Sequence, residues 1–426
     1  MSRMGNIAII GFGCAGYHAA KTLRENGYTG SIDVYSDTNE APYNPMLTTY
    51  FVSEKINEEG MYPFGTLEQV SAQLGVNMHT QTKVTRLHAR EHVVETKEGR
   101  SEPYEDIIIC TGAVPVVPPF ARSLQSNSYT MRTTADARAL EEKLAAGGVK
   151  SAVVVGGQMV GIKVVELLWK RNIKTILVDM APHIFPVSAC ESISQVIQQR
   201  LTEQGIEQHY SCALAGVEER ANSIRSAFSD GSSVVTDIIA FCSGIRANVP
   251  FVDQEEIPMG RAITVDIRMR TGAEHIYACG DCCEVADIQT GKVSSIGLWA
   301  NAAMQGKTAA LNILGRATEY QGNLIHNITH FMDMDFISIG DCHAEGEHMH
   351  WDGSGWQAEA IMNADGKPAC INILDNAKVS GPLKALLIKR FRAPCAPLSA
   401  AARLQLMKSG LPSEVIEILG GDNMEG

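Results

Sequence analysis

Residues 6–16 read NIAIIGFGCAG, and this stretch decides how the N-terminal part of the chain folds. The apolar run at residues 6–10 predicts a buried β-strand, and the apolar period after the glycines predicts a helix. In a Gly-x-Gly-x-x-Gly turn the first glycine permits tight turning, the second lets the backbone approach a pyrophosphate, and the third lets helix and strand pack closely. The stretch therefore predicts a dinucleotide site lined by Gly11, Gly13, Cys14, Ala15 and Gly16.

An acidic residue that binds a ribose hydroxyl is expected about 20 residues after such a turn. Asp37 lies at this distance, just after a second predicted strand at residues 31–35. Asp33 competes for this role, but it lies inside the strand. With strand, turn, helix and acid in order, a chance glycine turn explains the pattern poorly, and we expect Asp37 to bind the ribose.

The same pattern returns at residues 151–179, which read SAVVVGGQMVGIKVVELLWKRNIKTILVD. This repeat of strand, turn, helix and strand predicts a second nucleotide-binding domain. Asp179 at its acid position would repel a 2′-phosphate, so the site should prefer NADH to NADPH. Gln158 stands where the second glycine is expected, and a domain that no longer binds a nucleotide therefore stays an alternative. The predicted lining residues are Gly156, Gln158, Met159, Val160 and Gly161.

Two further turns end predicted strands. Thr111-Gly112 follows the strand at residues 107–110, and Gly280-Asp281 follows the strand at residues 276–279. Small residues at the carboxyl end of a parallel strand lie where ligands bind in such sheets. Asp281 can accept a hydrogen bond from a ribityl hydroxyl. The first of these turns lies between the two glycine fingerprints and the second lies after both. This order indicates nucleotide binding more specifically than either turn does alone.

The amino-acid composition and net charge limit which classes of protein this chain can belong to. The 426 residues are 45% hydrophobic and 20% charged, which suffices for two or three domains with cores. A net charge of −12 argues against nucleic acid and anionic membranes as partners. No run approaches the roughly 20 apolar residues of a membrane span. Without secretory features we expect a cytoplasmic protein whose 11 cysteines are thiols.

The order of these motifs resembles that of the FAD- and NAD-linked pyridine nucleotide-disulfide oxidoreductase superfamily. The chain looks most like the branch that holds NADH oxidases, rubredoxin and ferredoxin reductases, and the flavoprotein part of nitrite reductases. The similarity spans nearly the whole chain, and the matching stretches include GFGCAGYHAAKTL, PYEDIIICTGAVP, AVVVGGQMVGIKVVELL and IYACGDCCEVAD.

The resemblance implies an α/β fold with two Rossmann-like domains and a smaller α+β C-terminal domain. The FAD-binding domain would be discontinuous, at residues 1–115 and 245–325, with an NAD-binding domain inserted at residues 116–244. Residues 326–426 would form a C-terminal interface domain that supports a homodimer.

The resemblance also implies which residues hold each cofactor. Gly11, Gly13 and Gly16 would hold the FAD pyrophosphate, Asp37 the adenosine ribose and Asp281 the ribityl chain. A helix that starts at Leu298 and Trp299 would lie near the flavin pyrimidine edge, where its dipole stabilises reduced flavin. The other expected FAD contacts are Val84, Thr111, Gly112 and Gly280. Those expected for NADH are Gly156, Gly161, Asp179 and Gly244.

The chain departs from the family pattern at the expected reaction centre. Members that use a disulfide carry a cysteine shortly after the first acid, whereas residues 42–49 here read PYNPMLTT. We therefore expect no disulfide relay. Lys163 stands where the family usually carries a glutamate that helps to place the nicotinamide. Lys163, Thr48 and Trp299 are the candidate catalytic residues.

Two groups of cysteine and histidine have alternative interpretations. Cys279 and Cys282 form a CxxC around Gly280-Asp281, followed by Cys283, so redox chemistry is an alternative to simple packing at a strand end. A second group carries metal-ligand types but has no second pair of ligands, so a solvated or interface loop is favoured and no metal is expected. It comprises Cys342, His343, His348 and His350. His326 and His330 would share one face if their segment is helical.

The function that the sequence favours is hydride transfer from NADH to bound FAD, followed by electron delivery to a carrier protein or a partner subunit. Transfer to oxygen, as in NADH oxidases, or to an organic substrate stays an alternative. A flavin-binding subunit that only relays electrons, or stabilises an assembly, is the alternative from another class. No motif predicts nucleic-acid binding or membrane insertion.

Overall fold

The computed structural model describes residues 5–392 and 398–420. The chain forms two compact units, each assembled from separated stretches of sequence. Unit 1 consists of Met1–Val116, Arg132–Arg138 and Ile245–Gly322. Unit 2 consists of Val117–Met131, Ala139–Gly244 and Asn323–Gly426.

Unit 1 is built on a five-stranded parallel sheet with the order β19-β7-β1-β2-β3. Its central strand β1 is almost inaccessible from Ile7 to Ile10, because helices and loops cover both faces. The predicted strands at residues 6–10 and 31–35 are confirmed with these bounds. The strands are β1 (Asn6–Ile10), β2 (Ser31–Tyr35), β3 (Asn77–His79), β7 (Asp106–Ile109) and β19 (Ile276–Ala278).

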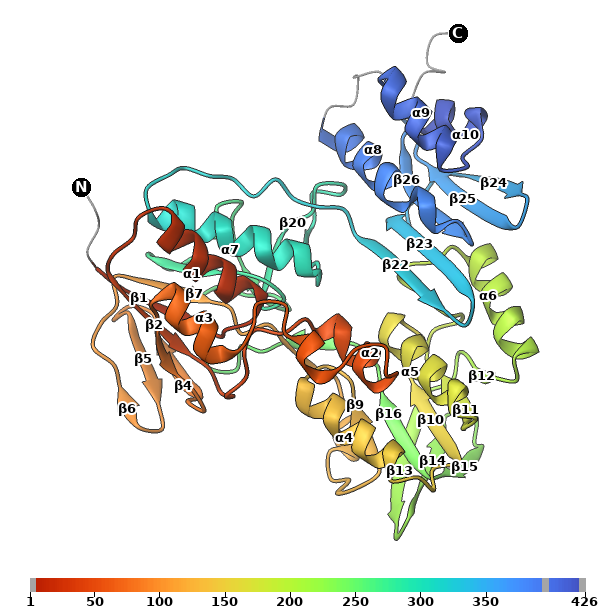
Figure 1. Cartoon of the computed structure of the whole chain (residues 1–426), viewed down its shortest axis with the longest axis horizontal. Helices are drawn as coiled ribbons and strands as arrows, with labels where there is room; N and C mark the ends of the chain where they lie inside the picture. The colour runs from red at the N-terminus through yellow and green to blue at the C-terminus, as the bar shows by residue number, and fades with distance from the viewer. Residues whose placement is uncertain (1–4, 393–397, 421–426) are drawn as a thin grey trace. The chain divides into compact units, whose positions relative to one another are not determined.

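Helices α1 (Cys14–Glu25) and α7 (Trp299–Ile313) pack closely together although they are far apart in sequence (Figure 1). Their approach depends on Gly306, where a Cβ atom would overlap the carbonyl oxygen of Ala15. Helix α1 begins in the glycine turn predicted to hold FAD, and the Cys14 thiol at its start donates to the carbonyl oxygen of Trp299, the first residue of α7, at 3.4 Å. The packing therefore brings two helix N-termini to the carboxyl ends of the strands, where ligands bind in such sheets.

Shorter elements complete unit 1. Helix α3 begins after a capping box in which Thr66 and Gln69 bond reciprocally. The remaining elements are α2 (Thr48–Val52), α3 (Leu67–Leu74), β4 (Val84–His88), β5 (Val93–Thr96), β6 (Gly99–Arg100), β8 (Ala113–Pro115), β17 (Ile245–Ala247), β18 (Ile263–Thr264), β20 (Cys283–Ala286) and β21 (Val293–Ser294).

Unit 2 repeats the parallel architecture, with a five-stranded sheet in the order β12-β11-β10-β16-β9. The predicted strand, turn, helix and strand at residues 151–179 are all present. Two parallel sheets with flanking helices confirm the predicted α/β class. The elements are β9 (Ser128–Thr130), most of α4 (Thr134–Ala145), β10 (Ser151–Val155), α5 (Met159–Lys170), β11 (Lys174–Val178), α6 (Glu191–Glu203), β12 (Glu207–His209), β13 (Leu214–Arg220), β14 (Ser223–Phe228), β15 (Ser233–Thr236) and β16 (Ile238–Phe241).

The C-terminal part of unit 2 is a five-stranded antiparallel sheet with the order β22-β23-β26-β25-β24. Figure 1 shows helices α8, α9 and α10 beside it. Its elements are β22 (His326–Phe331), β23 (Met334–Gly340), β24 (Glu347–Gly353), β25 (Trp356–Met362), β26 (Pro368–Leu374), α8 (Ser380–Arg392), α9 (Ala400–Lys408) and α10 (Ser413–Gly420).

The structure corrects two local expectations in this sheet. His326 and His330 lie on strand β22, so the helical face considered for them is wrong. His348 and His350 lie on the edge strand β24, not on a loop. Residues 326–331 are held as a strand by antiparallel pairing with β23 along their whole length. In β24 the less exposed Met349 and Trp351 alternate with exposed polar residues, which fits an edge strand with one exposed face.

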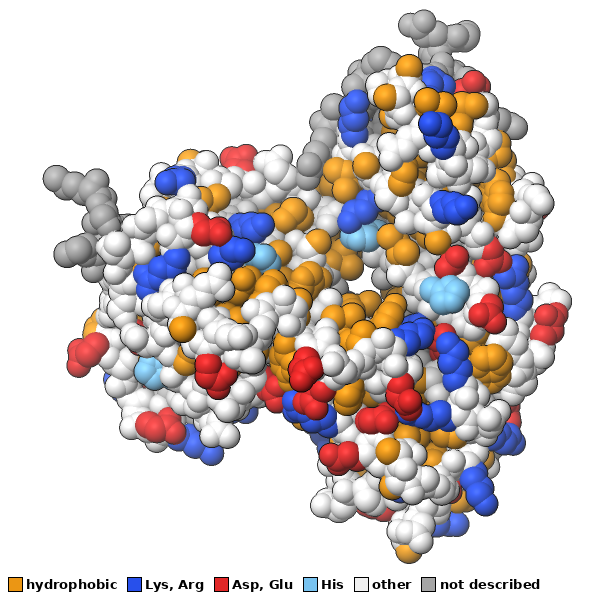
Figure 2. All heavy atoms as spheres, viewed as in Figure 1, with side chains coloured by type: hydrophobic (Ala, Val, Ile, Leu, Met, Phe, Trp, Pro, Cys, Tyr) orange, Lys and Arg blue, Asp and Glu red, His pale blue; other side chains and the backbone are white. Residues whose placement is uncertain are grey.

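The surface and the helices bear on possible partners. On the face drawn in Figure 2, acidic and basic side chains are interspersed and do not gather into one extended field. None of the helices in the described part of the chain combines the length and the apolar character needed to cross a bilayer.

Candidate functional site

The first glycine turn is held in shape by the fold itself. Gly11 has a φ of +97°, and a Cβ atom there would overlap the carbonyl oxygen of Cys110. A Cβ atom at Gly16 would overlap the carbonyl oxygen of Gly11. The Gly11 amide also donates to the Tyr35 carbonyl at 2.8 Å, which ties the turn to the end of β2. Both positions therefore require glycine whether or not a ligand is bound.

Gly13, in contrast, is not required by the fold. It is the N-cap of α1 with φ −83° and ψ −158°, a conformation open to any residue, and no atom lies within 4 Å of an added Cβ. The open space lies at a helix N-terminus, whose amides favour anions. A glycine that neither backbone nor packing demands is explained by the close approach of a ligand. These residues fit the pyrophosphate of FAD.

Arg132 is a site residue that the sequence analysis missed. Its Nη2 atom donates to Oδ2 of Asp281 at 2.6 Å, and both side chains are largely buried, with 22% and 14% exposure. The same guanidinium lies 3.9 Å from where a Cβ of Gly112 would be. Arg132 therefore brings a cation beside the strand-end turns predicted to hold FAD. No local signal marks it, because residues 116–244 were assigned to the other domain.

The two acids weighed for the ribose differ in their surroundings. Asp33 accepts hydrogen bonds from His79 at 3.0 Å and from Asn77 at 3.2 Å, so its carboxylate is engaged along the sheet edge. Asp37 is exposed just beyond β2. Val84, predicted to contact FAD, is the first residue of β4 and is only 6% exposed in the core. The assignments of Asp37 and Val84 to FAD stay predictions.

The second glycine turn has the same backbone design in unit 2. Gly156 has a φ of +112°, and its Cβ would overlap the Cys242 carbonyl oxygen. A Cβ atom at Gly161 would overlap the Gly156 carbonyl oxygen. Gln158 is the N-cap of α5 with φ −92° and ψ −176°, so it occupies the same extended conformation as Gly13. The fold accepts the glutamine, whose side chain occupies the position that Gly13 leaves open.

Asp179 is fixed beside this second turn. Its Oδ2 atom accepts a hydrogen bond from the Gly157 amide at 2.6 Å, and its Oδ1 atom accepts one from the Ala181 amide at 2.8 Å. The carboxylate is thereby aimed at the turn, as an acid that binds a ribose needs to be. Gly244, just beyond β16, has a φ of +100° and open space around its Cβ position. Met159 and Val160 form the first turn of α5.

The candidate catalytic residue Lys163 has two partners within unit 2. Its ammonium group lies 2.5 Å from Glu166 and donates to the carbonyl oxygen of His330 at 2.6 Å. The Lys163 side chain is 11% exposed and that of Glu166 is 5% exposed. Lys170 is a second cation on Glu166, at 2.7 Å. Lys163 therefore fastens α5 to strand β22, and its role in catalysis stays a prediction.

The other two candidate catalytic residues lie in unit 1. The Thr48 side chain is buried at the start of α2 and donates to the Pro45 carbonyl at 2.8 Å. Trp299 is the first residue of α7, directly after its N-cap Leu298. Its ring is stacked on Phe64 with centroids 6.0 Å apart, and Phe64 is stacked on Tyr17 at 3.8 Å.

The cysteines around Gly280-Asp281 are buried thiols. Cys279 and Cys282 have no exposed surface, and Cys283 is 2% exposed. Burial raises the pKa of Cys282 to about 12, and it raises the pKa of Cys279 well above its usual value. The thiolate is the reactive form, so this environment favours the packing interpretation over redox chemistry.

The histidine and cysteine group at residues 342–350 is engaged within the C-terminal sheet. His348 lies 2.6 Å from the buried Glu359, and His350 lies 3.8 Å from the same carboxylate. Within residues 5–392 and 398–420, no three histidine, cysteine or acidic side chains are arranged to hold a metal ion.

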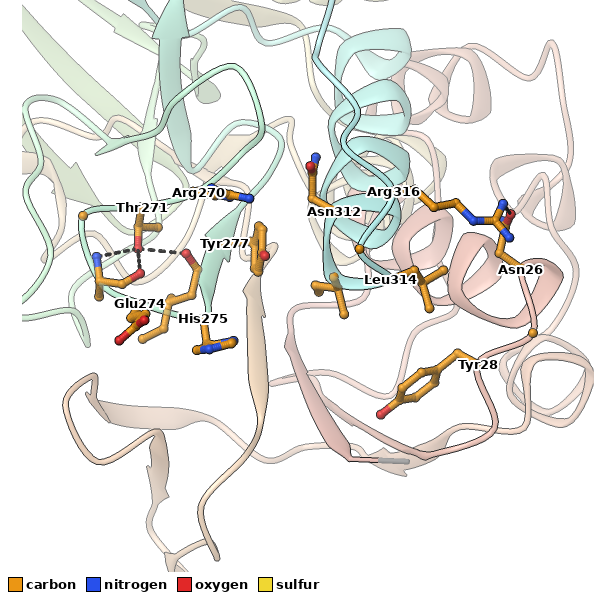
Figure 3. A pocket seen from close by; sticks show the side chains of 16 residues that line it. Asn26, Tyr28, Arg270, Thr271, Glu274, His275, Tyr277, Asn312, Leu314 and Arg316 are labelled. Carbon is orange, nitrogen blue, oxygen red and sulfur yellow. Dashed lines mark hydrogen bonds between the residues drawn. The ribbon is translucent and has the colours of Figure 1, made fainter. Parts of the chain in front are cut away.

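A cavity of about 840 Å³ lies elsewhere in unit 1 (Figure 3). It is lined by the chain after α1, by the end of α7 and by the segment that leads into β19, including Tyr28, His275 and Arg316. None of its lining residues was predicted to hold a cofactor. It lies at the amino end of β19 beside two helix C-termini, whose partial negative charge does not favour phosphates.

Comparisons with known proteins agree on a family. Residues 5–306 match the model of the pyridine nucleotide-disulphide oxidoreductase family. An NADH oxidase of Methanocaldococcus jannaschii is 25% identical, over 90% of each chain. The epsilon subunit of the NADH-dependent phenylglyoxylate dehydrogenase of Aromatoleum evansii is 24% identical, over 90% of this chain and 91% of its own. The reductase in the covalent putidaredoxin reductase–putidaredoxin complex has a TM-score of 0.86, with 19% identity and full coverage of both chains.

Proposed function

Because the chain belongs to the pyridine nucleotide-disulphide oxidoreductase family, we propose that it takes hydride from NADH onto bound FAD and passes the electrons to a small carrier protein. The chain is an FAD-dependent NAD(P)H oxidoreductase, and its cofactors are FAD and NAD(H). The acceptor is the proposed part. The observation that best supports the FAD site is the open space at Gly13. This residue leaves the N-terminus of α1 accessible, although the fold does not require a glycine there.

The residues of unit 1 would position the flavin. Bound FAD would supply a two-electron acceptor that takes one hydride and releases electrons one or two at a time. The amides at the start of α1 would bind the pyrophosphate, and Arg132 would add a positive charge. Asp281 would accept from a ribityl hydroxyl, and the start of α7 at Trp299 would stabilise negative charge on the pyrimidine edge.

The residues of unit 2 would position NADH. The Asp179 carboxylate, held by the Gly157 and Ala181 amides, would bind the adenosine ribose and disfavour a 2′-phosphate. Hydride transfer from NADH to a flavin needs no acid or base. The contribution of the chain would be to bring nicotinamide and flavin into alignment.

Two observations favour a carrier protein as acceptor. The segment that holds a redox cysteine in disulfide-using relatives has none here, and the Thr48 hydroxyl is already bonded to Pro45. The partly exposed rings of Phe64 and Trp299 offer an apolar contact next to the expected flavin edge. A solved structure of the same fold shows a reductase joined to the carrier putidaredoxin.

Anaerobic rapid mixing tests the proposal. NADH should bleach the flavin absorbance of the purified holoenzyme, and NADPH should do so at a much higher concentration. The reduced protein is then mixed either with an oxidised iron–sulfur carrier or with air. Fast reoxidation by the carrier and slow reoxidation by air support the proposal. Fast reoxidation by air alone identifies an oxidase, and a flavin that NADH never bleaches contradicts NADH as donor.

A flavin-binding relay subunit is the second candidate, because Gln158 crowds the nucleotide turn and Lys163 replaces the expected glutamate. The relative that is a dehydrogenase subunit is consistent with such an arrangement. In that case NADH fails to bleach the flavin of the isolated chain. Reduction of an organic substrate is distinguished by turnover without any carrier.

A homodimer in the cytoplasm is the organisation that we propose for the protein in the cell. The five-stranded C-terminal sheet would be part of the interface domain. Light scattering of the purified holoenzyme measures its mass directly, and a monomer at micromolar concentration contradicts the dimer.

A further inference from the structure

A row of polar residues crosses the whole C-terminal sheet. Asn327, Ser338, Asn372, Glu359 and His350 are consecutive cross-strand partners on β22, β23, β26, β25 and β24. The three in the middle are buried, with exposures of 0% for Ser338 and Asn372 and 2% for Glu359. Buried polar side chains in a sheet are costly unless they are hydrogen-bonded, so their partners reveal what the row does.

Four of these residues, Asn327, Ser338, Asn372 and Glu359, have hydrogen-bond partners in one short segment, residues 188–192, at the start of helix α6. Asn327 donates to the Ser188 hydroxyl at 2.9 Å, and Ser338 and Asn372 donate to the Ser188 carbonyl at 2.5 and 3.0 Å. Asn372 also accepts from the Cys190 amide at 2.6 Å. The Ser192 hydroxyl donates to Glu359, which His348 and His350 flank from the exposed side.

An aromatic contact extends this attachment towards the second glycine turn. Phe185 has no exposed surface, and its ring is stacked on Phe336 at 5.0 Å and meets the edge of Phe331 at 5.5 Å. The Phe185 amide donates to the Gly157 carbonyl at 2.9 Å. A continuous series of contacts therefore runs from the C-terminal sheet through Phe185 to the turn that carries Gln158.

The held segment belongs to the loop that follows the acid of the nucleotide site. Residues 180–190 come directly after Asp179 and have no helix or strand of their own. Buried backbone groups in a loop without regular structure need partners, and the C-terminal sheet provides those of Ser188 and Cys190. The Asp179 carboxylate accepts from the Ala181 amide at one end of the segment and from Gly157 in the turn.

We infer that the C-terminal sheet is a positioning element of the NADH site: the polar row and the Phe331–Phe336 pair hold residues 185–192 so that the second glycine turn and Asp179 keep the geometry that accepts the nucleotide. The inference rests on the proposed function, because it assigns a role toward NADH. Asn327, Ser338, Asn372 and Glu359 are positioning residues on this account. They contact neither nucleotide nor flavin.

Paired substitutions test the inference in the FAD-loaded protein. Asn372→Leu removes the bonds to Ser188 and Cys190 and keeps the number and branching of the side-chain atoms, and Ser192→Ala removes the bond to Glu359. Ile373→Val and Ile337→Val are the matched controls, because these buried neighbours point to the opposite face of the sheet. Ser192→Ala lies at a helix start and keeps the test informative if Asn372→Leu fails to fold.

Two readouts decide the outcome. Asn372→Leu should raise the dissociation constant of NAD⁺ by titration calorimetry, and the KM for NADH, at least fivefold, with kcat and FAD content unchanged. Ser192→Ala should raise both about twofold, and the controls should change neither. Amide hydrogen exchange should accelerate at residues 156–161 and 181–190 in the two variants and not in the controls.

The proposed function and the inference fail in different ways. If wild-type protein is not reduced by NADH, the proposed function is wrong, and the exchange comparison still decides whether the sheet holds the turn. If NADH reduces the wild type but the variants match their controls in KM and in exchange, the inference is overturned and the function stands. Uniformly faster exchange across unit 2 in Asn372→Leu, with an unchanged KM, also overturns it.

Discussion

The two glycine turns, one in each unit, share a backbone and differ at one position. Gly11 and Gly156 both have positive φ and both face a carbonyl oxygen of a neighbouring strand end. Gly13 and Gln158 both cap a helix in an extended conformation. The turns are therefore alike wherever the fold demands glycine, and they differ where only a ligand could demand it.

A glycine in such a sequence pattern can be required for one of two reasons, which the pattern alone does not distinguish. The difference between the two turns distinguishes them. A glycine required by positive φ or by a close backbone contact reports on folding. A glycine in an ordinary conformation with empty space around it reports on a ligand that comes close. By this criterion the first turn retains its adaptation to a pyrophosphate, whereas the second has accepted a side chain.

The largest effect is expected at the positions that the two turns share. Gly11→Ala and Gly156→Ala each force a positive φ on alanine and an overlap with a carbonyl oxygen, which together cost about 3 kcal/mol or more. Urea unfolding should show a similar loss of stability for both variants. A loss below about 1 kcal/mol in either one would mean that the turn relaxes and that the shared design is weaker than described.

The next largest effect separates ligand binding from folding. Gly13→Gln copies the second turn into the first and should reduce FAD content at least tenfold, because the side chain fills the approach to the helix N-terminus. Unfolding of the apoprotein should change by only about 0.5 kcal/mol, since no atom surrounds the new Cβ. The flavin-to-protein absorbance ratio and a urea titration measure both. Retention of full FAD content would contradict the role given to Gly13.

The reciprocal change should have a smaller effect. Gln158→Gly opens the second turn and should lower the KM for NADH by roughly threefold to tenfold, which corresponds to about 1 kcal/mol. Steady-state kinetics with NADH and with the carrier separately varied would show a change for NADH alone. An unchanged or higher KM would mean that Gln158 contributes to nucleotide binding and does not obstruct it.

The smallest effect is expected from thiol chemistry, in which the two turns should again behave alike. Burial, as the main cause, raises the pKa of Cys14 in the first turn and of Cys242 beneath the second to about 12. Only about one thiol in ten thousand is then ionised at pH 8, and the reactive fraction rises tenfold per pH unit toward 12. Mass spectrometry after iodoacetamide treatment at pH 7 to 9 should find both unmodified in folded protein. Selective labelling of Cys14 would reveal a stabilised thiolate at the α1 N-terminus.

The sequence predicted much of the sheet framework and the backbone of both turns. Strands β1 and β2 have their predicted bounds, because apolar period and glycine turns are local signals. The α/β class was implied by the resemblance that these motifs carry. The His326 and His330 segment was harder, because residues four apart share a face in a helix and in a strand alike.

Long-range contacts are what the sequence could not reveal. Arg132 and Asp281 are 149 positions apart, and Asn372 and Ser188 are 184 apart. Nothing local distinguishes Asn372 from a surface asparagine, and its burial follows only from the register of five strands. The same holds for the long-range bond of Lys163, whose acceptor is the backbone carbonyl of His330 and carries no side-chain signal.

The attachment of Phe185 to the C-terminal sheet also determines when the second glycine turn can reach its final structure during synthesis. Unit 2 is assembled from three stretches of chain, and the strands that cover Phe185 and Ser188 are completed only at Leu374. At ribosomal rates of about 5–20 residues per second, Leu374 is synthesised roughly 10 to 40 s after Gly157. The second glycine turn lacks its contacts with the C-terminal sheet until then. During that interval an apolar ring and several backbone groups lack their final partners. Exposed apolar surface of this kind favours aggregation, so we expect the nascent chain to be most prone to it after its first glycine turn has been synthesised and before its C-terminal sheet is complete.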